Sequence, residues 1–157
     1  MSEGEPRVIA CRNRKARHDY HIEEQIEAGI VLSGSEVKSL RLGKANLTDA
    51  YAAVRGGQAW LLKVHIDPYE QANRENHFSD RERRLLMHKH EIMRLDGKLR
   101  AKGLTLIPLE IYFRGSWAKV NLGLARGKRE YDKRHDIAER DSKRELAKIQ
   151  KRRQQRR

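Results

Sequence analysis

The sequence is short of the features that mark several common classes of protein. Its one cysteine, Cys11, cannot form an internal disulfide and has no second thiol with which to bind a metal. No apolar run approaches the roughly 18 to 20 residues that span a bilayer. The first residues, 1–5, lack the basic start and the apolar stretch of a signal peptide. We therefore expect a cytoplasmic protein that has no contact with a membrane.

Motifs of the common enzymes are also missing. The chain contains no HExxH, no phosphate-binding glycine loop and no GxSxG. The neighbouring carboxylates Glu23 and Glu24 fall on the solvated face of a predicted helix, where acid–base catalysis is much rarer than simple exposure. His88 and His90 stand two positions apart on another predicted helix, so they would point about 200° apart and could not share one metal ion. We expect no enzyme, no metal and no cofactor.

What the chain does have is positive charge, and it lies mostly at one end. The formal net charge is +13, of which residues 126–157 supply +8 through fourteen Lys or Arg and six Asp or Glu. Residues 1–17 carry +3, and residues 18–125 carry only +2. A near-neutral body with cationic ends is typical of a nucleic-acid-binding protein, with a merely solubilising tail as the alternative.

The hydrophobic pattern predicts one small body made mostly of strands. Because the tail has few large apolar residues, we place the core before residue 126. We expect an OB-like antiparallel β-barrel with about three helices, divided into a basic segment 1–17, a barrel 18–125 and a basic tail 126–157. The predicted helices cover residues 19–29, 35–41 and a stretch from Ser79 through Leu95. The predicted strands cover 29–34, 50–54, 59–66, 104–113 and 117–125, with an exposed loop over 67–77.

Two details of this pattern matter for the surface. The glycines of residues 55–58 can take positive φ, which favours a hairpin between two strands. In the last strand, Ala118, Val120, Leu122 and Leu124 point one way, while Trp117, Lys119 and Asn121 point the other. The exposed face of that strand therefore offers Trp117 for stacking on a base, although most strand tryptophans belong to the core.

Several longer motifs resemble the SsrA-RNA-binding (SmpB) family, in that family's order and spacing from about Val8 to Glu145. They are NRKARHDY (13–20), EAGIVLSGSEVKSLR (27–41), GKAN (43–46), HIDPYE (65–70), RLLMHK (84–89), GLTLIPL (103–109), GKREYDKR (127–134) and ERD (139–141). The resemblance implies an OB-fold adaptor that binds the tRNA-like domain of transfer-messenger RNA and delivers it to stalled ribosomes. It is implied to act as a monomer.

The resemblance also assigns roles to single residues. The implied RNA contacts are His18, Glu27, Leu86, Lys119 and Lys128, with Arg17, Lys38, Lys44 and Asn46 as further candidates. The implied contacts of the tail with the decoding centre and the empty message channel are Tyr131, Asp132, Lys133, Arg134, Ile137, Arg140, Lys143 and Arg144. Tyr131 occupies the place where the family stacks a ring on a base.

This chain departs from the family pattern at Ala138, where lysine is usual, at Ala72, where glycine is common, and at Asn121, where an acidic residue is common. Only the first falls in the tail. We also expect the tail to be disordered alone and helical on the ribosome, because scattered i to i+4 pairs cannot hold a helix. The alternative functions are a general RNA-binding or ribosome-associated structural protein and, less favoured, a nuclease.

Overall fold

The computed structural model describes residues 4–101 and 103–155, and for residues 73–75, 130 and 131 it describes the backbone only. The strands are β1 (Arg7–Arg12), β2 (Tyr20–Ile30), β3 (Ala45–Asn46), β4 (Tyr51–Arg55), β5 (Gln58–Leu62), β6 (His65–Ile66), β7 (Arg83–Leu86), β8 (Leu104–Arg114) and β9 (Trp117–Gly127). The helices are α1 (Ala16–Asp19), α2 (Gly34–Arg41), the 3₁₀ helix η1 (Glu70–Glu75), α3 (Lys89–Leu99) and α4 (Glu130–Gln155).

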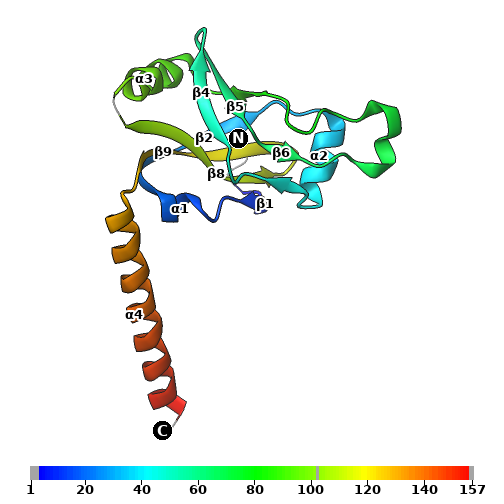
Figure 1. Cartoon of the computed structure of the whole chain (residues 1–157). Coiled ribbons are helices and arrows are strands. Elements are labelled where there is room, and N and C mark those ends of the chain that lie inside the picture. The colour runs from blue at the N-terminus through cyan, green and yellow to red at the C-terminus, as the bar shows by residue number, and fades with distance from the viewer. Residues whose placement is uncertain (1–3, 102, 156–157) are drawn as a thin grey trace.

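Six of these strands close into a ring of antiparallel pairs. The order is β8-β4-β5-β7-β2-β9, and β9 pairs again with β8. β1 adds to the outside of the ring by pairing with β8, so residues 7–12 of the basic N-terminal segment belong to the sheet. The prediction of a mainly β, OB-like barrel is confirmed. In Figure 1, α2 and α3 lie at different ends of the barrel, and α4 extends away from it.

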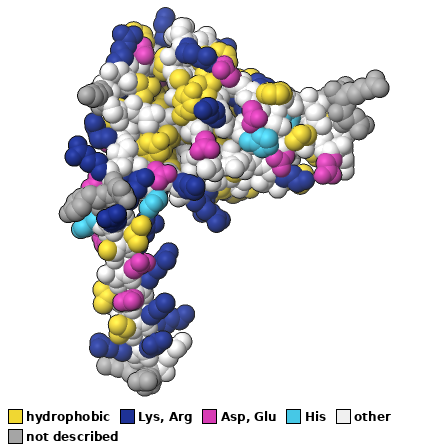
Figure 2. All heavy atoms as spheres, in the orientation of Figure 1, with side chains coloured by type: hydrophobic (Ala, Val, Ile, Leu, Met, Phe, Trp, Pro, Cys, Tyr) yellow, Lys and Arg dark blue, Asp and Glu magenta, His cyan; other side chains and the backbone are white. Residues whose placement is uncertain are grey.

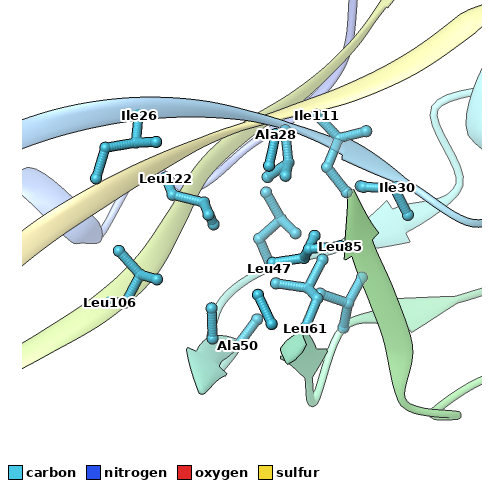
Figure 3. Packing of buried hydrophobic residues seen from close by; sticks show 14 of the residues in the cluster. Ile26, Ala28, Ile30, Leu47, Ala50, Leu61, Leu85, Leu106, Ile111 and Leu122 are labelled. Atoms are coloured by element: carbon cyan, nitrogen blue, oxygen red, sulfur yellow. The ribbon is translucent and has the colours of Figure 1, made fainter. Parts of the chain in front are cut away.

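The barrel is filled by the apolar residues that alternate along its strands. Figure 3 shows Ile26, Ala28 and Ile30 of β2 facing Leu85, Leu106, Ile111 and Leu122 from the surrounding strands. Leu106 and Leu122 are fully buried. Each buried leucine contributes about 1.5 to 3 kcal/mol of transfer free energy, so this cluster supplies the main stabilisation of the body.

The predicted helix over residues 19–29 is wrong. Only Ala16–Asp19 is helical, and Tyr20–Ile30 is the long strand β2. Ile22 and Ile26 lie four apart, which fits one face of a helix, but they are also the even positions of an alternating strand. From Gln25 onward, odd positions are exposed or half-buried and even positions buried. Pairing with β9 along nearly the whole strand outweighs the local helical spacing.

The predicted helix that starts at Ser79 is also wrong in its first half. Leu85 and Leu86 belong to strand β7, which pairs with β2 and β5. The helix itself, α3, begins at Lys89, and the Glu91 carboxylate accepts a hydrogen bond from the His88 backbone N–H at 3.3 Å. His88 therefore precedes the helix, and its ring stacks on that of His90 with centroids 5.5 Å apart, instead of pointing away from it.

The predicted strand over 29–34 is wrong past Ile30, because residues 31–33 belong to no helix or strand and α2 begins at Gly34. The predicted strand over 59–66 is divided into β5 and β6. The remaining predicted elements are confirmed in outline. Gly56 and Gly57 both take positive φ in the turn between β4 and β5, as the hairpin requires. β8 and β9 form the second hairpin around the predicted turn. α2 spans the predicted helical turns, while the segment predicted as a loop contains η1. None of the helices in the described ranges is long and apolar enough to cross a membrane.

A buried ion pair attaches α2 to the barrel. Glu36 of α2 and Arg83 of β7 are both fully buried and bond to each other. The Glu36 carboxylate also accepts hydrogen bonds from the Ser33 N–H at 3.0 Å and from Arg81 Nε at 2.9 Å. Burial would raise the pKa of Glu36, but these donors outweigh it and hold its pKa below the ordinary value. Arg83 in turn donates to the Val64 carbonyl at 2.7 Å, which fixes the segment between β5 and β7.

Candidate nucleic-acid interface

A groove on the outside of the barrel brings together three of the predicted RNA contacts. Its volume is about 690 Å³, and β2, the segment from Leu86 to His88, α3 and Lys119 of β9 form its walls. Glu27, Leu86 and Lys119 all line it, although 92 residues separate the first from the last. Arg94 of α3 lines it as well. The strand pairing of β2 with both β7 and β9 creates this site.

Glu27 is the polar centre of the groove. It lies on strand β2, within the range that was predicted as a helix. Its carboxylate accepts a hydrogen bond from Lys119 Nζ at 2.7 Å and another from the Tyr112 hydroxyl. Burial would raise the pKa of Glu27, but these two donors outweigh it and hold its pKa below the ordinary value. Glu27 is therefore an oriented anion at neutral pH.

Tyr112 is a member of this site that the sequence pattern did not single out. Its side chain is almost fully buried, and burial, together with the Glu27 carboxylate, raises the pKa of its hydroxyl to about 12. The hydroxyl thus remains a proton donor to Glu27. The guanidinium of Arg7 lies over the Tyr112 ring, 3.9 Å from its centroid. Because β8 is apolar on both faces, alternation along the strand could not identify Tyr112.

The groove offers both polar and apolar contact to a ligand. The Lys119 ammonium and the Glu27 carboxylate present a donor and an acceptor side by side, which suits a base edge or a ribose 2′-hydroxyl. Leu86 is half exposed at 50% and adds an apolar surface. Leu86 can lie there because Gly29 opposite has no Cβ; an added one would stand 3.2 Å from the Leu86 Cβ.

A second group of predicted contacts lies where the barrel meets α4. Lys128 Nζ donates to the Arg17 carbonyl at 2.8 Å and pairs with Asp136, so its side chain is only 7% exposed. His18 Nδ1 lies 3.4 Å from a terminal nitrogen of Arg140. In the structure, Lys128 therefore anchors α4 to the body rather than facing solvent.

The remaining predicted RNA contacts lie apart from both groups, around α2. Lys38 lies over the ring of Tyr69 at 5.3 Å. The Asn46 side chain accepts hydrogen bonds from the backbone and hydroxyl of Thr48, at 2.8 and 2.6 Å. Lys44 is exposed in the segment after α2. Figure 1 shows α2 at the end of the barrel opposite to α4.

The predicted tail contacts all fall on α4. Near its start, Asp132 lies 3.6 Å from His21, and Lys133 lies 3.4 Å from Asp19. Ile137 is 44% exposed and Arg144 is exposed, while Lys143 pairs with Glu139 at 2.7 Å. Arg134 also lies on this helix, and the side chain of Tyr131 lies outside the described residues. Figure 2 shows Lys and Arg side chains spread along the projecting helix.

One group of side chains in the described part of the chain has the spacing of a metal site. It consists of His135, Asp136 and Glu139 on α4, with ligand atoms within 4.8 Å of one another. Lys128 already binds the Asp136 carboxylate, and Lys143 binds that of Glu139. Both carboxylates are thus neutralised by lysines. His88 and His90 do not belong to such a group.

Comparison with known proteins gives a consistent family. The sequence profile of the SmpB protein family matches residues 10–152. An SsrA-binding protein of Carboxydothermus hydrogenoformans is 60% identical over 140 residues, covering 89% of this chain and 94% of its own. One from Moorella thermoacetica is 61% identical over 148 residues, covering 93% and 95%.

A solved structure is similar as well. A chain of the structure described as "tmRNA-SmpB: a journey to the center of the bacterial ribosome" superposes with a TM-score of 0.66 at 50% identity. The match covers 81% of this chain and 93% of that chain. With a profile match over most of its length and relatives at about 60% identity, the chain belongs to the SmpB family.

Proposed function

We propose that this protein binds the tRNA-like domain of transfer-messenger RNA and delivers it to stalled ribosomes, where trans-translation rescues the ribosome and tags the nascent chain. Relatives of this chain are named SsrA-binding proteins, and the similar solved structure is described by tmRNA, SmpB and the bacterial ribosome together. This role belongs in the cytoplasm, and it is that of an adaptor rather than an enzyme.

The observation that carries the proposal is the groove in which Glu27, Leu86 and Lys119 meet. The body around it is nearly neutral, so general attraction to phosphate contributes little to its binding. A paired carboxylate and ammonium beside an apolar side chain favour selective recognition of RNA shape and of ribose or base edges. His18 and Arg17 would contact the RNA near α4, and Lys128 would do so once its ammonium group leaves Asp136. Lys38, Lys44 and Asn46 would contact the RNA from the α2 end.

The tail takes a second role in this proposal. α4 would enter the decoding centre and the empty message channel, with Tyr131 stacking on a base. Asp132, Lys133, Arg134, Ile137, Arg140, Lys143 and Arg144 would make the other contacts there. Its basic side chains suit ribosomal RNA phosphates, because most of them lie exposed along a helix that projects from the barrel.

We further propose that residues 131–157 are disordered in much of the free population and become stably helical on the ribosome. Ile137, Leu146 and Ile149 are 44%, 60% and 47% exposed, so they stabilise the isolated helix very little. Past Arg140, no hydrogen bond or ion pair of a described side chain joins α4 to the barrel. An i to i+4 pair such as Glu139–Lys143 adds only about 0.2 to 0.5 kcal/mol.

The groove can be tested with a double variant and a matched control. Glu27→Ala/Lys119→Ala should weaken binding of the tRNA-like domain while leaving the circular dichroism spectrum unchanged. The control, Glu23→Ala/Arg126→Ala, removes another ion pair between β2 and β9 that lies outside the groove. An unfolded groove variant would show that these residues are structural, and equal RNA affinities of the two variants would argue against the groove.

Truncation after Lys128 separates the two roles. The shortened chain should bind the tRNA-like domain within about tenfold of the full chain, which corresponds to about 1.4 kcal/mol. It should fail to support tagging of stalled nascent chains. A larger loss of RNA affinity would identify the tail as a main RNA anchor and would favour the alternative, a general RNA-binding protein of the ribosome.

A further inference from the structure

A second hollow lies on the outer surface of the barrel and is lined mainly by arginines. It has a volume of about 370 Å³, and Arg7, Arg12, Arg14 and Arg17 all line it. Glu110 is the one acidic residue among its lining residues. Four guanidinium groups against one carboxylate give the hollow a net charge of +3, and all four arginines belong to residues 1–17, beside a near-neutral body.

We propose that this hollow binds backbone phosphates of the tRNA-like domain, beside the part of the RNA that occupies the groove around Glu27. The inference rests on the proposed function and adds a phosphate-binding subsite to it. Only Arg17 among the four arginines was a candidate RNA contact from the sequence.

Two of the four arginines are available for a ligand. Glu110 pairs with Arg7, and its other oxygen lies 3.7 Å from Arg12 Nε. In the described part of the chain, no hydrogen bond or ion pair holds the guanidinium of Arg14 or Arg17. Both side chains are exposed. Guanidinium groups bind phosphate oxygens in pairs of parallel hydrogen bonds, so these two arginines suit a nucleic-acid backbone.

The backbone that carries Arg14 and Arg17 is held firmly against the barrel. The Asn13 backbone N–H donates to the Leu109 carbonyl at 2.7 Å, and its side-chain amide donates to the Pro108 carbonyl at 3.1 Å. Ala16 is buried at 2% exposure. The turn that carries Arg14 and the short helix that carries Arg17 are therefore anchored to β8. A rigid backbone lowers the entropy lost when the two side chains bind a ligand.

The hollow is also continuous with the groove around Glu27. Gln25 lines both of them. It lies two residues from Glu27 on the same face of β2, which places the two residues about 7 Å apart along the strand. Its side chain accepts a hydrogen bond from Asn121 at 2.9 Å, and Asn121 also lines the hollow. An RNA seated on Glu27 and Lys119 would therefore reach the arginines without leaving this face.

The test is the salt dependence of RNA binding by the full-length chain. Arg14→Gln/Arg17→Gln removes two charges and no described intramolecular bond. The matched control Arg152→Gln/Arg153→Gln removes two arginines from the last turn of α4. Loss of two phosphate contacts should lower the slope of log Kd against log salt by about 1.4 to 1.8, and should weaken binding roughly tenfold at moderate salt. The control and Arg14→Lys/Arg17→Lys should keep most of the slope.

The outcomes separate this inference from the function on which it rests. If the Gln variant keeps the wild-type slope for the isolated tRNA-like domain, the phosphate subsite is refuted. The phosphate subsite is also refuted if the Gln variant loses only its binding to the ribosome, because the arginines would then face ribosomal RNA. If the wild-type chain itself binds an equal-length duplex as tightly as the tRNA-like domain, the proposed function fails, and the subsite for that RNA fails with it.

Discussion

Replacing Glu36 by alanine should destabilise the fold more than the loss of any surface ion pair. Glu36 and Arg83 are both fully buried, and Glu36 is the charged partner of Arg83. The variant would leave a buried guanidinium that keeps its bonds to backbone carbonyls but has no counter-ion. It would also remove the acceptor for the Ser33 N–H at the start of α2.

The expected magnitude follows from these two losses. Removing one member of a buried ion pair costs about 3 to 5 kcal/mol. Loss of the interaction at the helix start adds about 1 kcal/mol. A total of about 4 to 6 kcal/mol is comparable with the whole stability of many domains, about 5 to 15 kcal/mol. At about 2 to 4 °C per kcal/mol, the melting temperature should fall by roughly 8 to 24 °C.

Urea unfolding followed by circular dichroism measures this change. The control Glu82→Ala breaks the exposed pair with Arg55 and should cost no more than about 1 kcal/mol. Glu36→Leu/Arg83→Met, which removes both charges, should recover much of the lost stability. If Glu36→Ala cost under about 1 kcal/mol, or if the double variant were less stable than the single one, the ion pair would not hold α2 as we argue.

Glu36 should also make the free energy of unfolding depend on pH. Because the pKa of Glu36 is lowered in the folded state, its contribution is complete above the ordinary pKa of a glutamate. The contribution is lost as the pH falls through the lowered pKa. The difference in unfolding free energy between wild type and Glu36→Gln should therefore shrink in that acid range and stay constant near neutrality. A difference that grows as the pH falls would contradict the direction of the shift.

Three further predictions concern single side chains. Tyr112→Phe should weaken RNA binding severalfold in the wild-type background and have no further effect in Glu27→Ala, because the hydroxyl acts through that carboxylate; a double-mutant cycle of dissociation constants measures this. Cys11 should react slowly with a maleimide at pH 8, since burial raises the pKa of its thiol to about 11 and leaves about one thiol in a thousand ionised; labelling as fast as in the unfolded chain would refute this. Ile137→Pro should impair tagging of nascent chains without changing RNA affinity, since proline inside a helix costs about 3 kcal/mol. If RNA affinity fell by the same factor as the tagging activity, α4 would belong to the RNA-binding site.

The strands of the barrel were predictable wherever the pattern was unambiguous. The turns at Gly56–Gly57 and before Trp117 mark two hairpins, and alternation in β9 separates its core and surface faces. β2 was not predictable in this way. Ile22 and Ile26 fit both a helix and a strand, and only the long-range partners in β9 and β7 decide between them.

The candidate site was likewise predictable only where local sequence carries the signal. Long local motifs contain Glu27 and Leu86, and the resemblance together with the exposed face of β9 indicates Lys119. The meeting of the three in one groove depends on pairing among three strands. Tyr112 and Arg7 remain hidden because neither breaks a local pattern: one sits in an apolar strand, and the other in a basic segment. A residue whose role depends on a partner some 85 positions away leaves no signal in its own neighbourhood.

Competition binding tests the central claim most directly. Labelled tRNA-like domain of transfer-messenger RNA, bound to the full-length chain at moderate salt, would be challenged with unlabelled tRNA-like domain or with duplex RNA of equal length. The proposed function predicts that the tRNA-like domain displaces the label at a much lower concentration than the duplex, because the groove reads shape and particular contacts rather than charge. Equal displacement by both RNAs would contradict a dedicated adaptor and indicate a general RNA-binding protein.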